Sequence, residues 1–295
     1  MKEMTNKERE ETRSVGQFIP LQYHFSMLND TARMGSFRRA IEAIVKEGDK
    51  VLEFGGGTGV QSFFAAQKAE KVYYVEYNLG LVETAQEILA QNPNGDKVEI
   101  IHADGFKYNP PEPVDVVICE MLHVGLLREK QLEMIAAFKT RYAEVFPNEP
   151  MPFFIPGATI QAIQPVQQDF MFEGFYAPVV QFQDPYYLTP RTEPLGDPVV
   201  YHQLMYDQPY PLDCKWDGVI QMNAAGKFNA LRVITKSILA ILPETQEMID
   251  WSNQFLIHPL GKNIEVEAGQ TFEVSIDYAS GASLNAFKPI VKRVD

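Results

Sequence analysis

Apolar and polar positions follow two different periodicities along the first half of the chain. Residues 35–47, 60–69 and 79–92 carry apolar side chains near helical spacing, whereas residues 51–54, 71–78, 97–104 and 114–121 contain short apolar runs typical of buried strands. Strands that alternate with helices pair in parallel through right-handed crossovers. We therefore predict a doubly wound α/β sheet, whose ligands should lie at the carboxyl ends of the strands.

The alternation of helices and strands stops near Pro156. Short β-rich runs follow, for example at residues 158–166, 228–242 and 270–278, and turns that contain Pro, Gly or Asn separate them. This pattern is typical of a β sandwich or barrel. We expect a charged tail or helix at residues 1–16, an α/β domain at 17–155 and a β-barrel-like domain at 156–295.

Length and charge narrow the functional classes. A chain of 295 residues is long enough for two domains, and its formal net charge of −13 disfavours a nucleic-acid partner, because binding to phosphates requires Lys and Arg. A cationic substrate suits this charge better. No apolar run approaches the roughly 18 residues of a membrane span, and the charged first fifteen residues do not resemble a secretory signal. We expect a soluble, cytoplasmic protein without a membrane partner.

Metal binding is not expected from this sequence. The two cysteines, Cys119 and Cys214, stand alone, and the five histidines show no metal-ligand spacing. We interpret both cysteines as core residues.

A glycine-rich turn follows the first predicted strand. Residues 53–59 are Glu-Phe-Gly-Gly-Gly-Thr-Gly, and Gly55, Gly57 and Gly59 permit the positive φ and the close backbone approach that a nucleoside cofactor needs. Glu53 stands directly before this turn. A carboxylate there suits a cofactor with a positive amine and sulfonium, and it would repel the pyrophosphate of NAD.

Two further acidic residues end the next two predicted strands. Glu76 is placed to accept hydrogen bonds from both ribose hydroxyls, and Asp104 is placed to face the adenine edge. The three acidic strand ends should converge on one crevice. We predict S-adenosyl-L-methionine as the cofactor, with NAD binding and a purely structural turn as the alternatives. The Glu-x-Gly-x-Gly-x-Gly sequence resembles the first motif of class I methyltransferases.

A second pair of carboxylates follows the fourth predicted strand. Glu120 ends that strand, and Glu129 follows nine residues later. Two nearby anions are costly unless a cation lies between them, and a guanidinium offers planar, forked donors that both can bind. We predict that Glu120 and Glu129 are catalytic and orient a guanidinium. The alternative is that Glu129 is an ordinary exposed helix charge.

The chain resembles the protein arginine methyltransferase family at several points. Glu120 and Glu129 have the spacing of the family's double-E loop, and residues 24–33, His-Phe-Ser-Met-Leu-Asn-Asp-Thr-Ala-Arg, match its N-terminal segment. Matches in the second half extend the resemblance over residues 17–285. The resemblance implies a methyltransferase domain followed by a barrel for substrate and dimer contacts, an acceptor arginine in a protein or peptide, and a homodimer. It also implies that Arg33 grips the carboxylate of the cofactor.

Two departures from the family pattern concern the acceptor loop and the cover of the cofactor. The double-E loop has Met121-Leu122-His123-Val124 in place of Trp-Met-Gly-Tyr, which leaves substrate choice open. Within it, His123 is a candidate for contacting substrate or taking a proton near neutral pH. The aromatic segment that covers the cofactor is reduced to Phe18 and Tyr23.

A third departure lies in the family's Thr-His-Trp loop. This loop has Ile249-Asp250-Trp251 here, and we take Asp250 and Trp251 as substrate-binding candidates. An aspartate thus replaces the histidine that pairs with the acid corresponding to Asp30. Unless a cation or water intervenes, one of Asp30 and Asp250 should be protonated or displaced.

These departures keep two functional alternatives open, namely methyl transfer to a small guanidino or amino metabolite and a methyltransferase-like binding protein without turnover. The intact glutamate pair opposes the second alternative. Residues 170–192 are long and aromatic enough to form a dimer arm, or alternatively a strand that packs inward.

Overall fold

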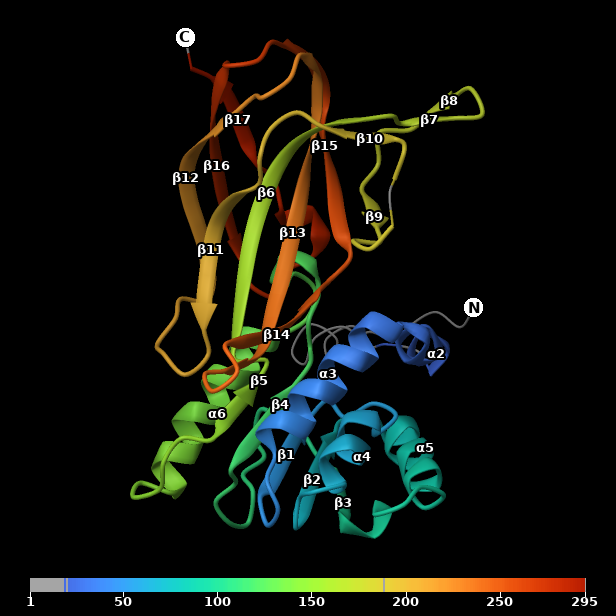
Figure 1. Cartoon of the computed structure of the whole chain (residues 1–295), viewed down its shortest axis with the longest axis vertical. Coiled ribbons are helices and arrows are strands. Elements are labelled where there is room, and N and C mark those ends of the chain that lie inside the picture. Colours follow the sequence, from blue (N-terminus) through green and yellow to red (C-terminus); the bar gives the residue numbers. More distant parts are fainter. Residues whose placement is uncertain (1–18, 20, 188, 295) are drawn as a thin grey trace, which may run out of the picture.

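The first half of the chain folds into a five-stranded parallel sheet with the order β3-β2-β1-β4-β5 (Figure 1). The computed structural model describes residue 19, residues 21–187 and residues 189–294. The strands of this sheet are β1 (Lys50–Phe54), β2 (Lys71–Glu76), β3 (Val98–His102), β4 (Val116–Cys119) and β5 (Phe153–Ile155). The direction of winding reverses between β1 and β4, and ligands of doubly wound sheets bind at the carboxyl ends of such strands.

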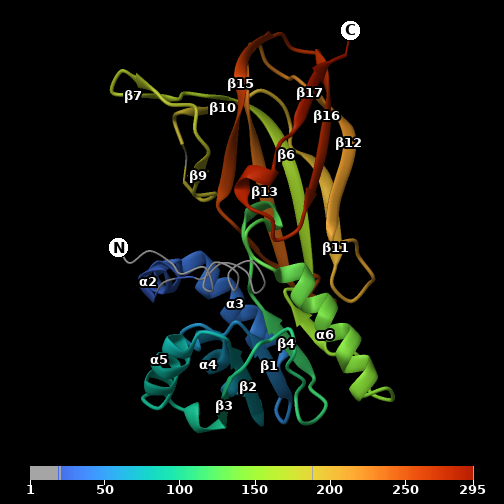
Figure 2. The same ribbon diagram turned by 180° about the vertical axis from the view of Figure 1, so that it is seen from behind.

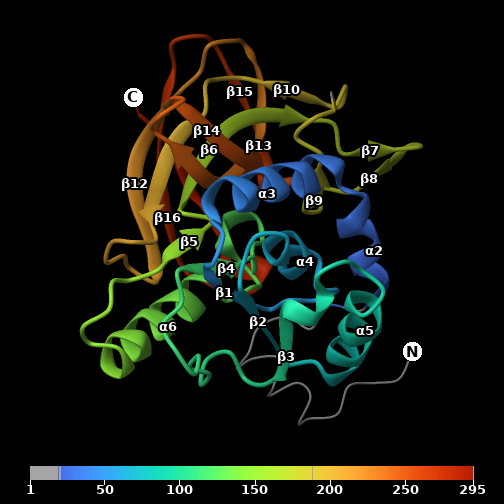
Figure 3. The same ribbon diagram turned by 60° about the horizontal axis from the view of Figure 1, so that its bottom comes forward.

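Helices cover both faces of the parallel sheet. α3 (Thr31–Ile44), α4 (Val60–Ala66) and α5 (Leu79–Leu89) lie on one face, and α6 (Gln131–Val145) lies on the other (Figure 3). α2 (Leu21–Asn29) precedes α3, and the short helix η1 (Gly95–Lys97) precedes β3. α3 begins four residues before the predicted helix at 35–47, because the Asp30 side chain caps it by accepting the N–H of Arg33 at 2.9 Å.

The second half consists of antiparallel strands. In one sheet the long strands β6 (Ala158–Gln168) and β13 (Gly226–Leu242) pair with each other. A second sheet of β12 (Asp213–Gln221), β16 (Thr271–Ala279) and β17 (Ile290–Arg293) packs on it, with the rings of Phe228 and Phe272 5.5 Å apart (Figure 2). The remaining strands of the first sheet are β9 (Gln181–Gln183), β10 (Thr192–Pro194), β11 (Val199–Met205), β14 (Glu247–Ser252) and β15 (Phe255–Val266).

The two halves contact each other through α3 and the β13–β14 hairpin. Phe37 of α3 packs edge-to-face on Trp251 of β14, with ring centroids 6.1 Å apart. Both side chains are buried. Because α3 also carries Arg33, this contact fixes one wall of the candidate site from the second half of the molecule.

A small hairpin projects from the second half of the molecule. It consists of β7 (Met171–Phe172) and β8 (Phe175–Tyr176), and Figure 1 shows it extending away from the antiparallel sheets. Met171, Phe172, Phe175 and Tyr176 are exposed. The alternative of a strand packed inward is therefore wrong for these residues. No helix in the described part of the chain is long and apolar enough to cross a membrane.

Candidate functional site

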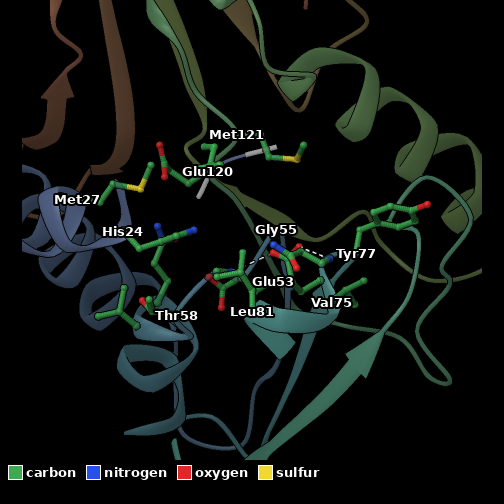
Figure 4. Close-up of a pocket in the computed structure, with 18 of the residues that line it drawn as sticks. His24, Met27, Glu53, Gly55, Thr58, Val75, Tyr77, Leu81, Glu120 and Met121 are labelled. Carbon is green, nitrogen blue, oxygen red and sulfur yellow. Dashed lines mark hydrogen bonds between the residues drawn. The ribbon is translucent and has the colours of Figure 1, made fainter. Parts of the chain in front are cut away.

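A cavity of about 650 Å³ lies at the carboxyl ends of β1, β2 and β4. In Figure 4, Glu120 and Met121 lie across it from Glu53 and Gly55, with His24 and Met27 at one side. The cavity brings together residues that we predicted for the cofactor and for the acceptor: Arg33, Glu53, Gly55, Gly57, Glu76, Asp104, Glu120 and Glu129. Four other predicted residues, Gly59, His123, Asp250 and Trp251, do not line it.

The turn after β1 requires glycine for its backbone conformation and for space. Gly55, Gly57 and Gly59 have φ angles of 67°, 54° and 81°, a region that other residues seldom adopt. A Cβ atom on Gly57 would also lie 2.8 Å from Cε1 of His24. Gly59 caps α4, and a Cβ there would meet Leu89 rather than the cavity, so Gly59 shapes the turn without lining the cavity.

Two side chains of β2 fix this turn. The Tyr74 hydroxyl donates to the carbonyl of Gly57 at 2.7 Å, and the Glu76 carboxylate accepts the N–H of Gly57 at 3.2 Å and that of Asn78 at 2.8 Å. A carboxylate has about four acceptor positions, so Glu76 retains capacity for further donors. We did not predict Tyr74, because a tyrosine inside a buried strand gives the same apolar signal as any core residue.

Glu53 lies at the cavity but is not the fixed anion that we predicted. It is 3% exposed and accepts a hydrogen bond from the Ser62 hydroxyl. Burial raises its pKa to about 8, so the carboxyl group is mostly neutral at pH 7 in this structure. A cation placed in the cavity would lower this pKa and favour the charged form.

Asp104 follows β3 at the edge of the cavity. One of its oxygens accepts the N–H of Phe106 at 3.0 Å, and the other pairs with the ammonium of Lys107 at 3.1 Å. Its carboxylate therefore caps the turn after β3 in addition to facing the cavity.

Arg33 connects the two groups of predicted residues. Its guanidinium forms an ion pair with Glu120 and lies over the ring of Trp251, 5.4 Å from the ring centroid. The side chains of Arg33 and Glu120 are only 15% and 8% exposed. Burial lowers the pKa of Arg33, and Glu129 and Asp30 raise it again. Trp251 therefore contacts Arg33 rather than the cavity, which corrects its prediction as a substrate contact.

Glu129 is the second carboxyl group on the acceptor side of the cavity. Burial raises its pKa to about 7, although Arg33 and Arg128 act in the opposite direction. This environment excludes the alternative of an exposed helix charge. A guanidinium that entered the cavity beside Glu129 would lower the pKa and make the carboxylate a stronger hydrogen-bond acceptor.

The loop between the two glutamates is held by the second half of the molecule. The N–H of Gly125, in the short helix η2 (Val124–Leu126), donates to the Thr235 hydroxyl at 2.7 Å. The Tyr278 hydroxyl donates to the Gly125 carbonyl at 2.8 Å. Thr235 lies on β13 and Tyr278 on β16, so both antiparallel sheets fix the middle of this loop. No local sequence pattern predicts these contacts, because they join residues more than a hundred positions apart.

His123 lies in the same loop but faces away from the cavity. Its Nδ1 lies 3.1 Å from the carbonyl oxygen of Val124, and its ring packs edge-to-face on Phe182, with centroids 5.6 Å apart. Burial lowers its pKa to about 4. Our interpretation of His123 as a proton acceptor near neutral pH is therefore wrong for this structure.

Asp250 and Asp30 have separate partners. Asp250 pairs with the ammonium of Lys236 at 2.9 Å, whereas Asp30 caps α3. Lys236 therefore supplies a cation to Asp250, and Asp30 is engaged by the backbone of α3. Asp250 does not line the cavity, which corrects its prediction as a substrate contact.

The predicted aromatic cover of the cofactor is not formed by Tyr23. Its side chain is 58% exposed and does not line the cavity. Phe18, the other residue of this prediction, and the predicted tail at residues 1–16 lie outside the described residues.

Comparison with known proteins relates the first half of the chain to methyltransferases. Residues 51–142 match a family model described as a methyltransferase domain. Protein arginine N-methyltransferase 6 of Danio rerio is 30% identical over 183 residues, which are 59% of this chain and 50% of that protein. An uncharacterised protein of Methanocaldococcus jannaschii is 27% identical over 270 residues, 90% of this chain and 95% of its own length.

Two solved structures share the fold over nearly the whole chain. The PRMT1 enzyme-prozyme heterotetrameric complex of Trypanosoma brucei with AdoHcy has a TM-score of 0.73 at 16% identity and covers 92% of this chain and 98% of its own. Protein arginine methyltransferase 10 of Arabidopsis thaliana has a TM-score of 0.74 at 17% identity, with coverages of 93% and 97%. The predicted fold class is confirmed, and so is the resemblance to the protein arginine methyltransferase family.

The hydrogen bond between Gly125 and Thr235 leads to a prediction for the stability of the protein. Thr235→Val should lower the free energy of unfolding by about 1–3 kcal/mol, because it leaves the buried N–H of Gly125 without an acceptor. Ser237 lies two residues further along β13, and among the described residues its buried hydroxyl has no partner. Ser237→Ala should therefore cost less than about 1 kcal/mol. Urea denaturation measures the free energy of unfolding of both variants. Equal losses in the two variants would contradict the role of Thr235 in fixing Gly125.

Proposed function

We propose that this chain, a methyltransferase with the fold of the protein arginine methyltransferases, transfers the methyl group of S-adenosyl-L-methionine to a guanidinium nitrogen of arginine in a protein or peptide. One observation carries the proposal. The glycine turn after β1 and the carboxyl groups of Glu120 and Glu129 line the same cavity. A cofactor on the turn and a cation between the glutamates would therefore meet inside the protein.

The cofactor half of the cavity fits S-adenosylmethionine by its donors and its space. Gly57 leaves room that a Cβ would fill. His24 lines the cavity, and its buried Nε2 has no hydrogen-bond partner among the described residues. In this proposal Glu76 holds the ribose, Asp104 faces the adenine edge, and Arg33 binds the carboxylate of the methionine part through donors that Glu120 leaves free.

The positive charge of S-adenosylmethionine is compatible with Glu53, because this residue can lose its proton when a cation binds beside it. An amine or sulfonium cation would draw Glu53 into its charged form and gain an ion pair, whereas a pyrophosphate would keep Glu53 neutral and gain no ion pair from it. Binding of a cationic cofactor is then linked to release of the proton from this residue. NAD remains the less suitable ligand for the same cavity.

The acceptor half of the cavity fits a guanidinium by charge and shape. Glu120 and Glu129 offer hydrogen-bond acceptors to the forked N–H groups of a guanidinium. The side chain of Glu120 is 8% exposed and Glu129 is half-buried, and partial exclusion of water strengthens such hydrogen bonds. Bonds to two of its nitrogens concentrate the positive charge there and leave the third nitrogen more nucleophilic. S-adenosylmethionine supplies the activated methyl group, and the chain contributes the alignment of the attacking nitrogen and the placement of charge.

A small guanidino or amino metabolite is the second candidate acceptor. The sequence Met121-Leu122-His123-Val124 favours it, because this segment replaces the residues that the family uses at the acceptor. Met121 also lies against the glycine turn, since a Cβ on Gly55 would be 3.4 Å from its Cγ. The buried glutamate pair serves either guanidinium acceptor.

We further propose a homodimer in which the β7–β8 hairpin of one subunit packs on α2 of its partner. The hairpin exposes Phe175 and Tyr176, at 71% and 52%, and α2 exposes Tyr23 and Phe25, at 58% and 70%. Two exposed aromatic surfaces of this kind are costly in water, and they cover each other when two copies associate. Since α2 also carries cavity residues, the partner would complete the wall of each site.

Cofactor binding is tested by the variant Gly57→Ala. The added methyl group strains the turn and displaces His24, so the affinity for S-adenosylhomocysteine should fall by about 5- to 150-fold, the range that overpacking usually costs. Gly48→Ala is the matched control, because Gly48 also has a positive φ but open space around it. Calorimetry on the two folded variants measures their affinities for S-adenosylhomocysteine. Equal affinities in Gly57→Ala and Gly48→Ala, or saturable binding of NAD in place of S-adenosylhomocysteine, would refute the cofactor assignment.

Binding of the acceptor guanidinium by Glu120 and Glu129 is tested by the variant Glu129→Gln and by the pH dependence of the reaction. The rate of methyl transfer should fall about 10- to 150-fold, the value of one hydrogen bond between charged partners. For the unaltered enzyme, kcat/KM should rise with pH through about 7, because deprotonation of Glu129 creates the charge that binds the acceptor. Glu129→Gln should lose this rise, whereas Glu144→Gln, at an exposed position of α6, should keep it. An unchanged pH dependence of kcat/KM in Glu129→Gln would contradict this role of Glu129.

The dimer is tested by light scattering. The unaltered chain should have twice the mass of one chain, and Phe175→Asp should shift it to the monomer, because the change places a charge in the aromatic contact. Ile290→Asp, an exposed position on β17, should remain dimeric. A monomeric mass for the unaltered chain at working concentrations counts against the proposal.

A further inference from the structure

We propose that Gln131 is a positioning residue that fixes the Glu120 carboxylate relative to Glu129 and thereby sets the geometry for the acceptor. The inference rests on the proposed function of the two glutamates. Gln131 does not line the cavity, and nothing in its sequence position distinguishes it from other residues of α6. Its side chain is fully buried at the first position of that helix.

The amide of Gln131 holds the chain on both sides of Glu120. Its Nε2 donates to the carbonyl of Cys119 at 2.6 Å, and its Oε1 accepts the N–H of Met121 at 2.9 Å. The thiol of Cys119 also donates to Oε1, at 3.4 Å. The residue between Cys119 and Met121 is Glu120, so a single side chain fixes the peptide groups before and after the carboxylate.

Glu120 needs such support because the sheet ends just before it. β4 stops at Cys119, whose neighbour in β1 is Phe54, and the ladder with β1 continues no further. Buried peptide groups beyond that point require other partners. An amide supplies one donor and one acceptor at the required spacing, and neither a carboxylate nor a thioether of similar length supplies both.

The same residue also connects the two ends of the acceptor loop. Gln131 follows Glu129 by two positions, at the point where α6 begins. Its hydrogen bonds therefore tie the start of the loop at Glu120 to the end of the loop at Glu129. The middle of the loop is fixed separately at Gly125 by Thr235 and Tyr278. Loss of the Gln131 hydrogen bonds would leave the middle of the loop in place, but the distance between the two carboxylates would no longer be fixed.

Gln131→Met tests this role, since methionine fills a similar volume without the hydrogen bonds. Hydrogen exchange of the Met121 amide should become roughly tenfold faster or more, because its acceptor is lost. The kcat for an arginine peptide should fall by up to about 100-fold, as small misplacements of reacting groups do, and the affinity for S-adenosylhomocysteine, which Glu120 affects only through its ion pair with Arg33, should fall by a clearly smaller factor. This split between turnover and cofactor binding is not expected from a general loss of stability.

Ile135→Val is the matched control, because Ile135 is buried one turn further along α6 and does not contact the loop through hydrogen bonds. It should leave both the Met121 exchange and kcat unchanged. Unchanged exchange in Gln131→Met overturns the proposal, and so does faster exchange with full kcat. If the unaltered enzyme transfers no methyl group to any guanidinium, the proposed function fails, and the Met121 exchange still decides whether Gln131 holds Glu120.

Discussion

The burial of three carboxyl groups around one cavity costs free energy that the surrounding residues must offset. An unpaired buried ion costs several kcal/mol even after relaxation. Glu53 avoids this cost by remaining neutral at pH 7 and accepting the Ser62 hydroxyl. Glu120 forms an ion pair with Arg33, and Glu129, with a pKa of about 7, is partly ionised at neutral pH. The cavity is therefore prepared for positive charge at two places, and in our account these are the sulfonium cofactor and the guanidinium acceptor.

The antiparallel half of the molecule contributes directly to this arrangement. Trp251 of β14 covers the guanidinium of Arg33, and Thr235 and Tyr278 hold the loop that carries the glutamates. An isolated parallel sheet would leave both the arginine and the loop without these supports. We therefore propose that the second half forms part of the framework of the candidate site.

The sequence was sufficient to predict features that depend on local pattern. The alternation of helices and strands identified the doubly wound sheet, and the spacing of Gly55, Gly57 and Glu76 identified the turn and the acid that line the cavity. Features that depend on tertiary contacts were missed or wrong. The neutral state of Glu53 follows from burial, the orientation of His123 follows from Phe182, and Tyr74 and Gln131 act through hydrogen bonds across the fold. No periodicity in the chain encodes these contacts.

The most direct test of the account is the mass and position of the methyl group after incubation with labelled S-adenosylmethionine. An arginine peptide, a matched peptide with lysine in place of arginine, and free guanidino compounds should be compared under the same conditions. We expect the mass of the arginine peptide to increase by one or more methyl groups, which fragmentation should place on guanidinium nitrogens, and we expect no increase for the lysine peptide. Transfer to the lysine peptide, or to no guanidinium at all by an enzyme that binds the cofactor, would contradict it.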